Sequence, residues 1–235
     1  MRVFCCSVRL RGRGDSSCIP CFVKCRRRFQ QVFFFELKAI TRPESASRRW
    51  CQGLATICRQ QNQMTRWYVS NADILDAKAD GLICSANPNL NLSGGVGGAF
   101  LLRYGTQMQD FLHGHLRSTG QRFIKPGHAV VAPPCGSAYM AIAHAVAIDA
   151  FYDTNCEFIR SAYENAIRQL AAASCRTIAA ACLACGYGRC SIANFIESIE
   201  PLIARQYPDV DSITLVTTNT ELSEALATVI NAVKS

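Results

Sequence analysis

The sequence of 235 residues has no long uninterrupted apolar run. Its apolar stretches are broken well short of the ~20 residues that cross a bilayer, so we expect a soluble protein without a membrane partner. It also lacks the G-x-x-x-x-G-K-S/T pattern of nucleotide-hydrolysing P-loops. No secretion signal is visible, and the seven cysteines beyond residue 63 are an odd number. We therefore expect reduced thiols and a cytoplasmic location.

Acidic residues are scarce in the first quarter of the chain. Residues 1–63 hold 13 Lys and Arg against 3 Asp and Glu, a net charge of +10. Residues 64–235 hold 12 Lys and Arg against 14 Asp and Glu, a net charge of −2. Such a change in composition marks a boundary. We therefore divide the chain into a basic, cysteine-rich N-terminal extension over residues 1–63 and one domain over residues 64–235.

The extension shows no sustained helical or strand period, so no packed core is expected there. We interpret it as disordered or not native, with Met64 as the real start of the protein. Its cysteines Cys18, Cys21 and Cys25 have a spacing that could hold zinc, but no histidine accompanies them and further regular pairs are absent. The Arg-rich composition would also suit an organellar transit segment or a nucleic-acid-binding segment, and we do not favour a nucleic-acid partner.

Strand-like and helix-like segments alternate through residues 64–235. Strands are expected at 66–70, 80–86, 128–133, 140–148, 177–184 and 212–218. Helices are expected at 99–118 with a break at Gly105, at 156–174, at 192–207 with a kink or break at Pro201, and at 221–234. This alternation predicts an α/β fold with a mostly parallel sheet and helices on both of its faces.

Two glycine-rich segments follow expected strands. Four of the five residues Gly94–Gly98 are glycine, and "CGYGR" begins at Cys185. A glycine-rich turn that enters a helix presents free backbone N–H groups and the positive end of the helix dipole, which suits phosphate. Neither segment contains lysine, and phosphoryl transfer generally needs a cation, so the segments favour binding over transfer.

The motifs "ADIL", "DGLICSANPNLNLSGGVGGA", "AIAHAV" and "LACGYGR" occur in this order. From about residue 68 to residue 216 the chain resembles the macro domain, the ADP-ribose-binding α/β/α module. The resemblance implies a three-layer α/β/α fold with a central mixed, mostly parallel sheet. It implies ADP-ribose or ADP-ribosylated protein as the partner of a monomer, with neither a cofactor nor a metal.

The resemblance also implies ligand-binding roles for twelve residues. They are Asp73, Ile74, Asn87, Gly94, Gly95, Val96, Gly97, Cys185, Gly186, Tyr187, Gly188 and Asn219. Asp73 would accept a hydrogen bond from the adenine amino group, and Asn219 would lie near adenine. Asn87 and residues 94–97 would hold the distal ribose and the diphosphate, and residues 185–188 would close over them. Asp73 could instead cap a short turn, and Asn87 could close an Asx turn.

The sequence leaves catalysis open. Cys84 replaces the first asparagine of the family's strand-end motif, and Gly97 stands where a hydrolase subgroup has an aspartate, so no side chain is available there as a base. We favour a module that binds ADP-ribose or ADP-ribosyl groups. The alternative is a hydrolase that removes mono-ADP-ribose from protein or deacetylates O-acetyl-ADP-ribose, with Asn87 as the catalytic residue that orients water.

Other residues of chemical interest have plainer interpretations. We interpret His144 as a core histidine with a satisfied hydrogen bond, and His113–His115 as surface residues. Cys182, Cys185 and Cys190 could form a metal or redox site, but small apolar side chains that fill space beside a ligand loop are the favoured interpretation.

Overall fold

The computed structural model describes residues 64–234, so the predictions for residues 1–63 lie outside the described residues. The strands are β1 (Arg66–Asn71), β2 (Gly81–Ala86), β3 (His128–Ala132), β4 (Ala141–Val146), β5 (Thr177–Ala181) and β6 (Ser212–Thr217). The helices are the short 3-10 helix η1 (Ile74–Asp76), α2 (Gly95–Tyr104), α3 (Gln107–Thr119), α4 (Cys156–Ala172), α5 (Ile192–Ile203) and α6 (Thr220–Lys234). The predicted alternation of strands and helices is confirmed.

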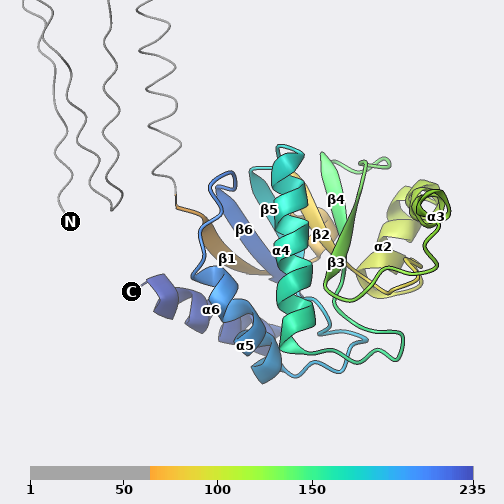
Figure 1. Ribbon diagram of the computed structural model, residues 1–235. Coiled ribbons are helices and arrows are strands. Elements are labelled where there is room, and N and C mark those ends of the chain that lie inside the picture. Colours follow the sequence, from red (N-terminus) through yellow and green to blue (C-terminus); the bar gives the residue numbers. More distant parts are fainter. Residues whose placement is uncertain (1–63, 235) are drawn as a thin grey trace, which may run out of the picture. The chain divides into compact units, whose positions relative to one another are not determined.

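The six strands form one sheet in the order β1-β6-β5-β2-β4-β3 (Figure 1). All neighbouring strands are parallel except β3 and β4, which pair antiparallel. The sheet is therefore mixed and mostly parallel, as predicted. The carboxyl ends of β1, β6, β5 and β2 meet at one edge, and this is where ligands bind in open α/β sheets.

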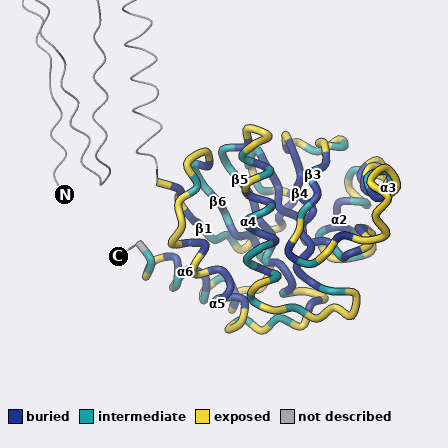
Figure 2. The backbone as a smooth tube through the Cα atoms, in the orientation of Figure 1, coloured by how far each residue is buried: buried dark blue, intermediate teal, exposed yellow. Residues whose placement is uncertain are grey.

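Helices cover both faces of the sheet and make the fold three-layered. Alternate residues of β4 enter two different cores: Ala143 and Ala145 pack with α4, α5 and α6, whereas Ile142 and Val146 pack with α2 and α3. Strands β2, β4 and β5 are almost fully buried, whereas the edge strands β1 and β3 keep some exposed residues (Figure 2). Both faces of β2, β4 and β5 are covered, which explains their continuous apolar character.

Helix α4 is tied to the end of β5 through one buried side chain. The Tyr163 hydroxyl donates to the Ala181 carbonyl at 2.5 Å and accepts from the Leu183 N–H at 3.3 Å. Tyr163 is fully buried, and a buried phenol that is satisfied in this way fixes the backbone that it contacts. Helix α4 therefore positions the start of the second glycine-rich segment.

Most element boundaries differ by a few residues from the sequence expectation, and three differences bear on the site or on the chain's chemistry. Helix α2 begins at Gly95, inside the glycine run, with Gly94 as its N-cap. Strand β5 ends at Ala181, since the chain turns into the second segment and Ala184 has a positive φ of 62°. Pro201 lies within α5, in its last turn, where the missing N–H removes only one bond. None of the helices within residues 64–234 has the length and apolar character needed to span a membrane.

Candidate functional site

A cavity of about 810 Å³ lies at the carboxyl edge of the parallel strands. Its walls come from the segments that follow β1, β2, β5 and β6. All twelve residues predicted from the sequence line it: Asp73, Ile74, Asn87, Gly94, Gly95, Val96, Gly97, Cys185, Gly186, Tyr187, Gly188 and Asn219. The volume is within the roughly 300–1,000 Å³ range of small-molecule sites. The two glycine-rich segments therefore share one cavity.

The first glycine-rich segment forms the N-terminus of α2. Gly94 is the N-cap and provides no capping side chain, and the first intrahelical bond runs from the Gly98 N–H to the Gly94 carbonyl at 3.0 Å. The N–H groups of Gly95, Val96 and Gly97 precede that bond and have no acceptor within the helix. An uncapped helix start that faces a cavity is suited to an anion.

Two glycines of this segment are closely packed. A Cβ on Gly97 would lie 3.1 Å from Leu92 Cδ2 and 3.3 Å from Leu92 Cα. A Cβ on Gly94 would lie 2.8 Å from the Tyr187 hydroxyl oxygen. By contrast, Gly98 has its nearest neighbour at 3.7 Å. The position at which the hydrolase subgroup has an aspartate thus has little room for a side chain in this protein.

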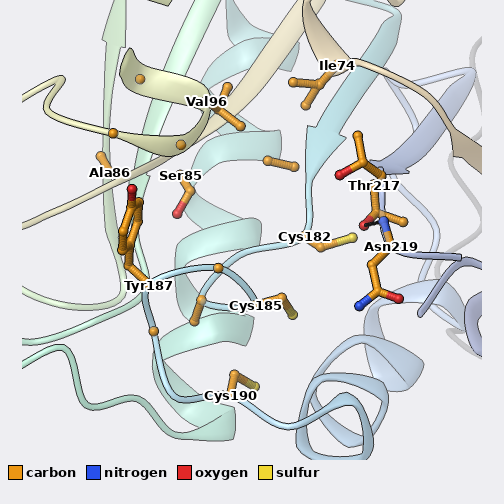
Figure 3. A pocket seen from close by; sticks show the side chains of 18 of the residues that line it. Ile74, Ser85, Ala86, Val96, Cys182, Cys185, Tyr187, Cys190, Thr217 and Asn219 are labelled. Atoms are coloured by element: carbon orange, nitrogen blue, oxygen red, sulfur yellow. Dashed lines mark hydrogen bonds between the residues drawn. The ribbon is translucent and has the colours of Figure 1, made fainter. Parts of the chain in front are cut away.

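The second glycine-rich segment reaches across the cavity to the first. The Tyr187 ring rises from its loop toward the start of α2 and lies against Gly94 (Figure 3). Tyr187 is otherwise 72% exposed. A Cβ on Gly188 would lie 2.6 Å from the Ala184 carbonyl oxygen, whereas Gly186 has open space. Tyr187 is therefore the contact that joins the two segments.

Asp73 caps η1, in agreement with the simpler of its two interpretations. Its Oδ1 accepts from the Leu75 N–H at 2.9 Å, and its Oδ2 accepts from Arg103 Nη2 at 3.3 Å. Arg103 Nη1 also donates to Asp76 Oδ1 at 2.6 Å. Carboxylate oxygens accept more than one hydrogen bond each, so the capped Asp73 keeps capacity for a ligand donor. No sequence motif indicated Arg103, which lies 30 residues away on α2.

Asn87 directs its side chain into its own loop. Its Nδ2 donates to the Asn91 carbonyl at 2.8 Å, and its Oδ1 accepts from the Asn91 N–H at 3.1 Å. Helix α3 holds the same loop, since Gln109 Nε2 donates to the Leu90 carbonyl and His113 Nε2 bonds to Asn91 Oδ1. His113 is half-buried in this contact and is not a free surface residue. Asn87 therefore closes its own loop through a residue four positions on rather than through the Asx turn, which bonds two positions on. The catalytic role of Asn87 stays a prediction.

Asn219 lies where β6 passes into α6. Its Oδ1 accepts from the Leu222 N–H at 3.0 Å and caps the helix, and its side chain lies along the cavity wall beneath Thr217 (Figure 3). The family resemblance implied its place beside the ligand, whereas the capping role is visible only in the structure. Ser85 and Tyr152 also line the cavity, although neither was among the residues predicted to bind ligand.

Three thiols line the cavity and pack against the core on their other side, namely those of Cys182, Cys185 and Cys190. Cys182 Sγ lies 3.9 Å from the Val216 carbonyl oxygen, and burial raises the pKa of this thiol to about 12. The neighbouring thiols act on each other, so that the pKa of Cys185 is raised and that of Cys190 is lowered, and the Cys190 thiol donates to the Ser191 carbonyl at 3.5 Å. Within residues 64–234 no group of three or more His, Cys, Asp or Glu side chains could hold a metal.

His144 is buried beneath α2 and α3, as predicted, but the expected hydrogen bond is wrong. It pairs in register with Cys84 of β2, and neither ring nitrogen has a hydrogen-bond partner among the described residues. Its neighbours on that face of β4, Ile142 and Val146, are apolar and provide no acceptor. Burial lowers the pKa of His144 to about 4 and raises that of Cys84 to about 12. Both groups are therefore neutral at neutral pH.

Residues 83–199 match the family model for the macro domain. The described domain belongs to the macro domain family. The match begins within β2 and ends within α5, so it includes both glycine-rich segments. Among curated protein sequences, no match to this chain was found.

Solved structures share the fold of this macro domain at low identity. A mutant of the Oceanobacillus iheyensis macrodomain with ADPR has a TM-score of 0.62 and 14% identity, over 71% of this chain and 92% of that one. The Trypanosoma brucei macrodomain in complex with ADP has a TM-score of 0.56 and 13% identity, over 70% of this chain and 67% of that one. Alphavirus P23pro-zbd has 0.57 and 16%, over 73% of this chain, which spans 24% of the alphavirus protein.

Proposed function

We propose that this macro domain binds ADP-ribose, free or attached to protein, in the cavity between its two glycine-rich segments. The observation that carries the proposal is the contact of Tyr187 with Gly94, which joins the segments above a common cavity. The free N–H groups at the start of α2 provide donors for a diphosphate without any lysine in either segment. Two phosphates held by backbone donors suit binding better than phosphoryl transfer.

The end of the cavity near η1 suits the adenine of ADP-ribose. Asp73 is half-exposed and fixed in place by the Leu75 N–H and by Arg103. A fixed carboxylate that still has free lone pairs is an acceptor for the exocyclic amino group of adenine. Ile74 and Leu75 are buried next to it and give that end of the cavity an apolar wall. Solved macrodomains with ADPR and with ADP are consistent with this assignment.

Calorimetry tests the proposal directly. ADP-ribose should give heat and a saturable isotherm with the full chain, while ATP and NAD should bind more weakly because they carry a third phosphate or a nicotinamide. Asp73→Ala should weaken ADP-ribose binding by roughly tenfold through loss of a hydrogen bond to a charged group. Absence of heat with ADP-ribose would end the proposal, and unchanged affinity of Asp73→Ala would remove the adenine assignment.

Hydrolysis has less support from the geometry. Both polar atoms of the Asn87 amide already bond to Asn91, and Gly97 has no side chain and little space for one. A turnover assay on mono-ADP-ribosylated protein and on O-acetyl-ADP-ribose decides between binding and catalysis. Release of ADP-ribose that Asn87→Ala abolishes would replace the binding proposal with an enzyme.

A further inference from the structure

The loop between β4 and α4, residues 147–155, lies at the same edge of the sheet as the cavity. Strand β4 is parallel to β2, so the carboxyl ends of the two strands meet there. Tyr152 of this loop lines the cavity. Asp153 forms an ion pair with Arg189 of the second glycine-rich segment, at 3.4 Å between Asp153 Oδ1 and Arg189 Nη1. The loop therefore borders the cavity next to that segment.

The order of the strands places residues 147–155 at the opposite end of the cavity from Asp73. Asp73 follows β1, residues 147–155 follow β4, and strands β6, β5 and β2 lie between them (Figure 1). Four steps of about 4.8 Å from strand to strand put the two ends about 19 Å apart. In the proposed binding mode, with adenine at Asp73 and the diphosphate at the start of α2, the distal ribose lies toward β4. Protein is attached to this ribose, so an attached polypeptide leaves the cavity beside residues 147–155.

This loop presents two consecutive aromatic side chains. Phe151 is 78% exposed and lies outside the cavity wall, whereas Tyr152 is 45% exposed and belongs to the wall. Asp149 Oδ1 accepts from the Phe151 N–H at 2.8 Å and from the Asp153 N–H at 2.9 Å. The Asp149 N–H donates to the Asp153 carbonyl at 2.9 Å. Because these bonds close the turn that carries Phe151, covering its ring costs little further backbone ordering.

We propose that Phe151 is the contact for the polypeptide that carries the ADP-ribosyl group, and that it receives an apolar side chain next to the modified residue. The inference rests on the proposed ADP-ribose function and names the partner as ADP-ribosylated protein. Tyr152 inside the cavity and Phe151 outside it are consecutive, so a ligand that continues out of this end as a peptide chain meets Phe151. Free ADP-ribose ends within the cavity and does not reach it. Aromatic side chains are enriched in protein interfaces, which fits this role.

Calorimetry of the full chain with two ligands tests the contact. One ligand is free ADP-ribose, and the other is a synthetic peptide with ADP-ribose on a single residue and a leucine beside it. Phe151→Ala should weaken binding of the peptide by about fivefold and leave free ADP-ribose within about twofold of wild type. Phe123→Ala, an exposed ring before β3 and outside the cavity wall, is the control and should change neither. An unchanged affinity for the peptide, or an equal loss with both ligands, would overturn the proposal.

A matched pair of peptides tests the preference for an apolar neighbour. Replacing the leucine beside the modified residue by serine should weaken binding to the wild-type chain by about threefold, because less apolar area is buried. In Phe151→Ala the two peptides should bind equally, and a preference that persists there would overturn the proposal. A wild-type chain that binds neither free ADP-ribose nor the peptides would refute the proposed function itself. Normal binding of free ADP-ribose without the leucine preference would refute only the Phe151 contact.

Discussion

The two glycine-rich segments hold the same cavity in different ways. The first is built into a helix: Gly95, Val96 and Gly97 are the opening turn of α2, and Gly97 packs tightly on Leu92. The second is a loop between β5 and α5, with Tyr187 exposed at its apex and the cavity-lining Cys185 and Cys190 on either side of it. Sequences of similar composition therefore give one segment whose shape is set by its helix and one that depends on a few loop contacts.

This difference gives the two segments different roles: the first holds the ligand, and the second controls entry to the cavity. A helix start offers its N–H groups at fixed positions, since the rest of α2 and its packing through Phe100 hold them there. A loop that carries a large exposed ring can move without disturbing the core. We expect substitutions in the first segment to act on how the ligand is held, and substitutions in the second to act on whether the cavity closes.

The largest effect is expected from a methyl group in the second segment. Gly188→Ala places its Cβ 2.6 Å from the Ala184 carbonyl oxygen, so the loop must change its path. Overpacking of this kind costs about 3 kcal/mol, and affinity for ADP-ribose should fall by roughly 100-fold. Gly186→Ala, whose Cβ meets no protein atom, is the comparison within the same loop and should lose less affinity than Gly188→Ala. Equal affinities in calorimetry would show that the loop is not held by this contact.

Acid should lower the stability of the fold through His144, which is buried beneath α2 and α3. The unfolded chain protonates His144 near its ordinary pKa of 6.5, whereas the folded chain protonates it only near about 4. The unfolded state therefore binds more protons between these values, and stability falls as the pH falls. Between pH 7 and pH 5 the loss from this group is about 2 kcal/mol.

Chemical denaturation at the two pH values measures this loss, with His144→Leu as the comparison. The leucine variant should lose less stability on acidification, because the buried group that titrates is gone. Hydrogen exchange at pH 5 should then increase first in β4 and α3 rather than in α5 and α6. The same acid dependence in both proteins would place the sensitivity elsewhere.

The contact between the segments can be broken from either side. Gly94→Ala would bring a Cβ within 2.8 Å of the Tyr187 hydroxyl oxygen. The ring is exposed and can shift, so we expect about a tenfold loss of affinity, equivalent to about 1.4 kcal/mol. Gly98→Ala has its nearest neighbour at 3.7 Å and should be near neutral. In a Tyr187→Ala background the effect of Gly94→Ala should shrink, and fully additive effects in this double-mutant cycle would contradict the contact.

The smallest effect is expected from Arg103, which lies on the helix of the first segment and holds Asp73. Its guanidinium is partly exposed, so the ion pair itself contributes little. Arg103→Ala should weaken ADP-ribose binding by about threefold, through a less fixed Asp73. Arg117→Ala, on α3 outside the cavity, controls for the lost charge. If Arg103→Ala changed the binding of ligands that carry phosphate but no adenine, and left ADP-ribose binding unchanged, Arg103 would have no role in adenine recognition.

The order of elements and the residues around the cavity could be predicted from the sequence, because both depend on local pattern. Apolar runs such as Gly81–Ala86 identify buried strands, and glycines after strand ends identify the loops at one edge of a parallel sheet. The start of α2 was misplaced because a helix that begins in glycine has no propensity signal. The site residues came from a family resemblance and from their position after strands.

What the sequence could not show depends on contacts between distant side chains. Arg103 reaches Asp73 only because α2 returns over η1, and Gln109 and His113 reach the loop at Asn87 because α3 packs beside it. The hydrogen bond expected for His144 is missing because it faces Val130, which is apolar, and Cys84, whose thiol donates to the Ser85 carbonyl instead. Local patterns contain no information on such partners.

The buried hydroxyl of Tyr163 has a consequence for how this molecule can evolve. It links a helix on the far side of the sheet to the residues from which the ring-bearing loop departs. Selection for altered ligand residence could therefore act on α4, out of reach of any ligand. A screen limited to the cavity wall would miss such variants.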